Sequence, residues 1–470
     1  MNNSLSRRTA NGLAVLALAA IATGCVQLKS PTSPALSAGP APTGWSATNA
    51  VADRVQDNWL AAFGDAQLAN LVSEALTNNP DLAATAAKLA EATASAKVSS
   101  ADLWPSLSAS GSGQNSSRLK RTTEEKNGGV KSDTSTFGAS LDLSWEVDVW
   151  GRLRYARRSA TKTAAASAQD YAAARKSLAA QVAKAWFAAV EAQLQAKLTD
   201  EFVSSYEDTL HLVEVRFQAG AVTEQDVANA RADLASSRQQ AEAATTTARS
   251  AVRSLELLLG RYPATELQVA TDLSAMPPAI PAGVPADLLA RRADLLAASK
   301  RVNAAFDNTQ AAAAARLPKL SLTSSLGTSS AELKNVLDPK NAALTLAGNL
   351  AAPLFDGGRL KAQSQLAQAQ QREALAGYRS TVLAAFGEVE NYLESETALA
   401  REEIQLREAA TQYETARRIA ETRYQAGSIS LTDVLTIQRQ ELQSKSGLLA
   451  MRNNRLATRV NLHLALGGDF

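Results

Sequence analysis

The stretch Arg216-Phe217-Gln218-Ala219-Gly220 decides the fold, because it occurs again 207 positions later as Arg423-Tyr424-Gln425-Ala426-Gly427. Further matches keep the same order and offset: Gly151-Arg152-Leu153 with Gly358-Arg359-Leu360, and Leu259-Gly260 with Leu466-Gly467. Pro105 and Pro318 match at an offset of 213, so the first copy carries six more residues between Pro105 and Gly151. Matches in one order over so long a stretch indicate two tandem repeats.

Each repeat opens with a helix and a β-hairpin. The helical stretches run from Asp81 to Trp104 and from Asp287 to Leu317, and a proline ends each one. Segments 105–150 and 318–356 then alternate apolar and polar residues, which predicts paired strands with one apolar face. In the first hairpin the apolar face carries Phe137, Ala139, Leu141, Leu143 and Trp145.

A very long helix follows each hairpin, from about Leu153 to Gln218 and from about Leu360 to Gln425, with no internal proline. At 1.5 Å per residue, each helix reaches roughly 100 Å. In the first, large apolar residues recur every fourth position, a row that drifts around a straight helix. The drift predicts neighbouring helices on both sides. The row is Leu178, Val182, Trp186, Val190, Leu194, Leu198, Phe202, Tyr206 and Leu210.

Each long helix ends in a predicted tight turn. Gly220 and Gly427 suit the left-handed residue that closes a helix. Thr223 to Asp226 and Ser430 to Asp433 have the spacing of a helix-opening cap. We therefore predict helical hairpins over 153–260 and 359–467, within repeats spanning 65–260 and 286–467. The proline-rich segment 261–285 is predicted to link the two repeats.

The N-terminus has the layout of an exported protein. Arg7 and Arg8 precede an apolar run from Leu13 to Ala22, which predicts a signal peptide over residues 1–24. Cys25 follows directly in Ala22-Thr23-Gly24-Cys25, which resembles a bacterial lipobox that has Ala where Leu is commoner. Cys25 is therefore the predicted lipidation site. Residues 25–64 are rich in Pro and Ser and are predicted to form a lipid-anchored tether along the surface.

Composition argues against several classes of protein. One Cys and two His leave no scope for a Cys/His metal cluster or an intrachain disulfide. Removal of the signal peptide, with Arg7 and Arg8, leaves 46 cationic and 46 acidic residues, without the cationic excess that nucleic-acid binding needs. We find no nucleophile and base arrangement and no phosphate loop. The expectation is a protein that is no enzyme and takes no cofactor, metal or nucleic acid.

Four strands with one apolar face favour a lipid bilayer, but a membrane barrel needs at least about eight strands to close. One chain cannot close such a barrel, so the sequence predicts an oligomer.

The order of these elements resembles the TolC-like outer membrane efflux channels, in particular their lipoprotein branch serving resistance-nodulation-division (RND) pumps. The resemblance covers residues 25–470. The residues that carry it are the run Val147 to Leu153, Leu317-Pro318, the run Phe355 to Arg359, both Arg-aromatic-Gln-Ala-Gly tips, and the run Leu464 to Gly468. It implies a mainly α fold with a membrane β-barrel: a homotrimer with a 12-strand barrel among outer membrane lipids and a 12-helix periplasmic tunnel.

The resemblance also implies a passive conduit that exports small molecules, docked on a periplasmic adaptor and an inner-membrane RND pump. Two tip segments would meet the adaptor, although each is also a good turn: Gly220, Ala221, Val222 and Thr223, and Gly427, Ser428, Ile429 and Ser430. The periplasmic constriction candidates are Thr432, Asp433, Thr436 and Arg439. Thr432 and Thr436 depart from the Leu and Asp that pump-coupled relatives often place there, and Asp433 is equally suited to a cap.

Alternatives remain open at this stage. A periplasmic adaptor or a coiled-coil scaffold lipoprotein also uses helical hairpins, although two tandem hairpins and the alternating strands favour the channel. Trp145 and Trp150 suit either an interfacial aromatic girdle or ordinary packing. His211 and His463 stand alone in helical stretches, which argues against metal binding. The exported substrate cannot be read from the sequence.

Overall fold

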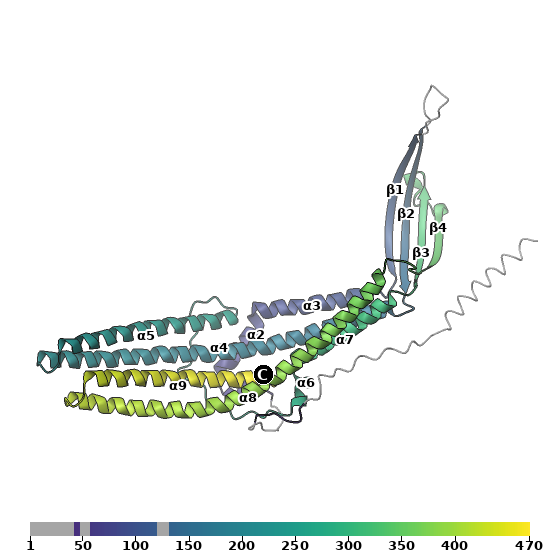
Figure 1. The fold of residues 1–470 in the computed structure, drawn as a ribbon. Coiled ribbons are helices and arrows are strands. Elements are labelled where there is room, and N and C mark those ends of the chain that lie inside the picture. Colours follow the sequence, from purple (N-terminus) through teal and green to yellow (C-terminus); the bar gives the residue numbers. More distant parts are fainter. Residues whose placement is uncertain (1–41, 48–56, 120–130) are drawn as a thin grey trace, which may run out of the picture. The chain divides into compact units, whose positions relative to one another are not determined.

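The computed structural model describes residues 42–47, 57–119 and 131–470. Cys25, the signal peptide and most of the predicted tether lie outside these residues. Figure 1 shows the chain as two successive sets of helices and strands. The first set is α2 (Ala66–Asn78), α3 (Pro80–Ala101), β1 (Ser106–Leu119), β2 (Lys131–Val147), α4 (Arg152–Gln218) and α5 (Glu224–Leu258). The second is α6 (Leu288–Arg291), α7 (Ala293–Ala314), β3 (Lys319–Ser330), β4 (Ala342–Ala351), α8 (Arg359–Gln425) and α9 (Leu431–Ala465).

The two long helices α4 and α8 each contain 67 residues, as the proline-free runs predict. Gly151 and Gly358 precede them with φ of +83° and +84°. In α4 the Asp148 carboxylate accepts the free Leu153 N–H at 3.0 Å, which satisfies one of the unpaired donors of the first turn. Helix α4 packs against α3, α7, α5 and α9, which confirms the predicted neighbours on both sides (Figure 1).

The four strands form one antiparallel sheet in the order β1-β2-β3-β4. Ser106 pairs with Ser144 in the first hairpin, and Lys319 pairs with Ala351 in the second. Ser106 and Lys319 are related by the offset of 213, and Ser144 and Ala351 by the offset of 207. Both hairpins therefore share one register, and the six extra residues of the first repeat lie in the connection between β1 and β2.

The face of the sheet that the alternation predicts to be polar carries a hydrogen-bonded network. The Asp142 carboxylate accepts the hydroxyls of Ser140 and Ser325, each at 2.6 Å. These residues come from β2 and β3, so the network ties the first hairpin to the second.

The helix predicted from Asp287 to Leu317 is in fact two helices, α6 and α7. Arg292 between them is extended, with φ of −76° and ψ of 120°. Asn79 has nearly the same conformation between α2 and α3, 213 positions earlier. The Asn79 side chain donates to the Leu258 carbonyl, and the Arg292 side chain donates to the Ala465 carbonyl. Ala465 is the repeat counterpart of Leu258. The break fixes the start of each repeat to the end of its own hairpin, which residue periodicity does not reveal.

The end of the predicted surface tether is buried instead. Residues Trp59–Phe63 form a short 3-10 helix, and Trp59 and Phe63 are 3% and 4% exposed. Phe63 packs on Phe187 of α4 with ring centroids 5.2 Å apart. Two aromatic rings gain too much from leaving water to lie along a surface. Within the described parts of the chain, no helix combines the length and the apolar character needed to cross a membrane.

Candidate functional site

Both hairpin tips close in the same way. Gly220 and Gly427 have φ of +71° and +74°, which confirms the predicted left-handed residues. The Ala221 N–H reaches back to the Arg216 carbonyl at 2.9 Å, and the Gly220 N–H to that of Phe217 at 2.9 Å. The second tip repeats these two bonds from Ser428 and Gly427. This pair of bonds satisfies the last free carbonyls of each long helix.

Reciprocal caps start the return helices. The Asp226 N–H donates to the Thr223 hydroxyl, and the Asp226 carboxylate accepts the Thr223 N–H at 2.9 Å. Ser430 and Asp433 repeat the arrangement, which confirms both predicted caps. Val222 and Ile429 pack against the apolar cluster beneath the tips. Internal hydrogen bonds and apolar packing thus hold the tip backbone in place. The residues exposed at its apex are Gly220, Ala221, Thr223, Gly427, Ser428 and Ser430.

An Arg on one tip holds the aromatic residue of the other. The Arg216 guanidinium carbon lies 4.6 Å from the centre of the Tyr424 ring, and its Nη1 donates to the Tyr424 carbonyl. Tyr424 is 3% exposed. A cation over an aromatic face is attracted by the ring quadrupole, more so when shielded from water. This contact joins repeat one to repeat two at the apex.

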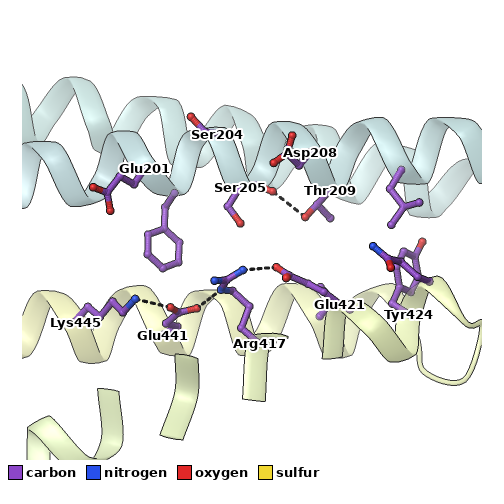
Figure 2. Close-up of a pocket in the computed structure, with 14 residues that line it drawn as sticks. Glu201, Ser204, Ser205, Asp208, Thr209, Arg417, Glu421, Tyr424, Glu441 and Lys445 are labelled. Carbon is purple, nitrogen blue, oxygen red and sulfur yellow. Dashed lines mark hydrogen bonds and ion pairs between the residues drawn. The ribbon is translucent and has the colours of Figure 1, made fainter. Parts of the chain in front are cut away.

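A cavity of about 500 Å³ lies between α4 and the second hairpin, next to the tips on the side towards the rest of the helices. Figure 2 shows the side chains of α4 facing a row of charged residues on α8 and α9. Glu441 of α9 is 1% exposed and pairs with Arg417 of α8 and, at 2.8 Å, with Lys445. Arg417 also pairs with Glu421 at 2.6 Å. Burial of a lone charge is costly, and the two cations offset the cost of burying the Glu441 carboxylate.

The same positions of the first hairpin are apolar. Arg417 and Glu441 correspond, at the offset of 207, to Leu210 and Leu234, which belong to the apolar cluster under the tips. The sequence prediction missed the charged network, although an aligned comparison of the two repeats would have exposed the exchange of two leucines for an ion pair. The first hairpin therefore has leucines where the second hairpin has this ion pair.

Polar contacts continue across the contact between the repeats. Gln438 of α9 is fully buried, and its amide donates to Thr209 of α4 at 2.9 Å. Ser205, one turn away, lies 3.3 Å from the same nitrogen. The two hairpins thus meet here through hydrogen bonds as well as apolar packing.

The constriction candidates lie on the first turns of α9. Thr432 is exposed, and its carbonyl accepts the Thr436 hydroxyl at 2.7 Å within the helix. Asp433 caps the helix, and its carboxylate accepts the Ser430 hydroxyl at 2.8 Å. Arg439 lines a second cavity with Tyr206 and Asp233. Burial raises the pKa of Tyr206 to about 12, Asp233 adds to the rise, and Arg439 opposes it. Thr432, Asp433 and Thr436 are thus close together, whereas Arg439 also contributes to this separate cavity.

The remaining predicted residues have internal partners or lie in solvent. The Trp145 indole donates to the Leu103 carbonyl at 3.0 Å, and that of Trp150 to the Pro318 carbonyl at 2.7 Å. Trp145 of β2 is thereby bonded to the segment that follows α3, and Trp150, beyond the end of β2, is bonded to the segment between α7 and β3. His211 is exposed, and His463 is buried in α9.

In the described part of the chain, a sheet with two unpaired edges is carried on two long helical hairpins with hydrogen-bonded tips. This is the architecture of a subunit of a membrane channel with a helical extension. The sequence profile described as "Outer membrane efflux protein" matches residues 71–261 and 284–468, and the chain belongs to that family. The chain is accordingly an outer membrane efflux channel protein with a periplasmic helical portion. The alternatives of an adaptor or a scaffold are thereby set aside.

Comparison with individual proteins agrees. The chain is 34% identical to the pyoverdine export outer membrane protein OpmQ of Pseudomonas putida over 464 residues, 97% of both chains. It superposes on the solved outer-membrane channel OprN with a TM-score of 0.84 at 25% identity, covering 93% of this chain and 98% of that one. For a crystal structure of CusC the TM-score is 0.82 at 27% identity, covering 93% and 98%. Channels of this family are trimers that work with adaptors and inner-membrane pumps.

Proposed function

We propose that three copies of this chain form a passive conduit, which receives small molecules from a periplasmic adaptor and an RND pump. The observation that carries this proposal is the sheet: β1 and β4 each have a paired neighbour on one side only. An unpaired strand edge is costly in lipid, and three four-stranded sheets supply the strands for a closed barrel. The chain itself performs no chemistry in this proposal.

The tips are the proposed docking surface for the adaptor. Their backbone hydrogen bonds are satisfied internally, so the exposed side chains are free to contact a partner. Ala221 and Ser428 occupy the same place in the two tips. Two such tips per chain give six nearly equivalent positions per trimer, which suits an adaptor that presents helical hairpins around a ring.

The lipobox at Cys25 is the proposed anchor of the N-terminus. A single acyl chain binds a membrane only marginally, and stable attachment needs further contacts. The barrel would supply these, so the lipid would assist localisation rather than replace the barrel. Thr432, Asp433 and Thr436 remain the proposed lining of the periplasmic constriction.

The docking proposal is tested with Ala221→Trp and Ser428→Trp combined, in a host that lacks its own channel. Lys334→Trp, in the exposed connection between β3 and β4, is the matched control. We expect the tip variant to accumulate as outer membrane trimers but to lose efflux and adaptor cross-linking, while the control retains both. A tip variant that still exports at the parent rate would refute docking at the tips.

A further inference from the structure

The contact between Arg216 and Tyr424 occurs inside one chain, between its two repeats. At the repeat offset of 207, Arg216 corresponds to Arg423 and Tyr424 to Phe217. The counterpart pair has the same residue chemistry, a guanidinium and an aromatic ring. It is not formed within the chain: Phe217 is 44% exposed, against 3% for Tyr424. Arg423 is also exposed, and among the described residues its side chain has no hydrogen bond or ion pair.

The helices nearer the sheet show the same asymmetry. Helix α7 of the second repeat packs between α8 and α4. Ten of its residues are buried, including Val302 and Phe306. Its counterpart α3 packs against α4, and only Leu82 in it is buried. Helix α7 uses one face to pack on α4, and among the described residues no helix packs on the corresponding face of α3. The repeat counterpart of α4 is α8. A second α8, from another copy, fits this face.

We propose that Arg423 of one subunit seats on Phe217 of the partner subunit, so that the contact between subunits copies the contact between repeats at the tips. This proposal rests on the trimer proposed above and specifies how its tips are joined. In a trimer, first and second repeats alternate around the ring. Arg216 of each first repeat contacts Tyr424 of the next repeat in the same chain, and Arg423 of each second repeat would contact Phe217 of the next repeat, in the partner subunit. Three contacts lie within chains, and three lie between chains.

The chemistry of the Phe217 site fits a guanidinium. The Phe217 side chain is partly exposed, and a guanidinium is attracted to the face of an aromatic ring. The Phe217 carbonyl accepts the Gly220 N–H at 2.9 Å, as the Tyr424 carbonyl accepts that of Gly427. The Tyr424 carbonyl accepts the Arg216 guanidinium in addition to its backbone donor, so the equivalent Phe217 carbonyl can accept an Arg in the same way. The Tyr424 hydroxyl is buried and has no hydrogen-bond partner among the described residues, so the lack of a hydroxyl on Phe217 removes no such bond.

Cross-linking tests the proposal on the full-length protein in outer membranes. Phe217→Cys and Arg423→Cys are combined in one chain and treated with a short bismaleimide. The control combines Arg423→Cys with Val215→Cys, because residue 215 lies two positions along α4 and points to a different side of the helix. Both single variants and the parent, which share Cys25, complete the set.

We expect covalent dimers and trimers from the Phe217/Arg423 pair on denaturing gels and at least a tenfold lower yield from the control. Trimers on native gels without intersubunit cross-links would overturn the tip contact while leaving the proposed channel intact. A protein that is monomeric before treatment would instead refute the proposed trimer.

A second measurement keeps the test decisive if the Cys pair fails to assemble. Arg423→Met, Phe217→Leu and their combination are compared for the rate at which purified trimers dissociate on heating. We expect each single variant to dissociate several-fold faster, and the double variant no faster than the worse single one. Independent, multiplicative effects would show that the two residues do not meet.

Discussion

The indole of Trp59 stacks on the imidazole of His463, with ring centroids 5.7 Å apart and planes inclined by 23°. The backbone reinforces this contact, because the Asn58 N–H donates to the Asp469 carbonyl at 2.7 Å. The segment that precedes the first repeat is thereby fastened to the helix that ends the second. His463 is 5% exposed as a result.

This burial makes stability depend on pH. Burial, with a smaller contribution from Arg459, lowers the pKa of His463 to about 3, from 6.5. Below pH 6.5 the unfolded chain therefore binds a proton that the folded chain excludes, and stability falls as pH drops from 6.5 towards 3, by up to about 1.4 kcal/mol per unit. His463→Phe keeps a ring but cannot be protonated. We expect the thermal stability of the parent protein to decline relative to that of this variant between pH 7 and pH 4.5. Parallel pH profiles would contradict the assignment.

Two glycines with the same backbone conformation should differ in their tolerance of a side chain. Gly220 and Gly260 have φ of +71° and +75°, but a Cβ at Gly260 would lie 2.6 Å from the Asn78 carbonyl oxygen, whereas at Gly220 it meets open space. Gly220→Ala should cost only the left-handed strain, about 1 kcal/mol. Gly260→Ala must also displace backbone and should cost more. Equal losses in the midpoint of thermal unfolding would show that the contact at Gly260 is relieved without cost.

The strands of neighbouring subunits should pair in the register of the internal pair. Ser140 of β2 pairs with Gly327 of β3. The repeat offsets carry this pair to Ala347 of β4 and Gln114 of β1 in the partner subunit. Opposed residues lie about 4.5–5.5 Å apart at Cα, within disulfide reach. We expect oxidation to link subunits of a variant with Gln114→Cys and Ala347→Cys.

Asn115→Cys with Ala347→Cys is the matched control for this register, because a shift of one residue moves a side chain to the other face of the sheet. Preferential linkage of the control pair would show a shifted register at the subunit boundary.

The charged pair at the cavity should be replaceable by the leucines of the first repeat. Arg417→Leu alone leaves the buried Glu441 with Lys445 as its remaining cation. It should cost about 3 kcal/mol, the low end for breaking a buried ion pair. Glu441→Leu added to it recreates the Leu210 and Leu234 arrangement and should recover most of this loss. A double-mutant cycle on chemical unfolding measures the coupling. Additive losses would indicate that the cavity, not the charge, sets the cost.

Local features of this protein follow from the sequence alone. The lengths of α4 and α8, the left-handed Gly220 and Gly427 and the caps at Thr223 and Ser430 depend on residues within a few positions of one another. The repeat offsets also predict the strand register of one hairpin from that of the other. Each of these properties is set by bonds along the chain or by backbone conformation, so a linear pattern is sufficient to predict it.

Burial and pairing were decided only by the tertiary structure. Tyr424 and Phe217 stand in nearly the same local sequence, yet the first lies under Arg216 and the second remains exposed. Trp59 lies in a stretch that resembles a tether, but His463, about 400 residues away, provides its stacking partner. Arg417 and Glu441 become an ion pair only where α8 and α9 meet. Such contacts depend on which helix lies across the interface, and the energy gained by excluding water from a side chain is fixed by those distant neighbours rather than by adjacent residues.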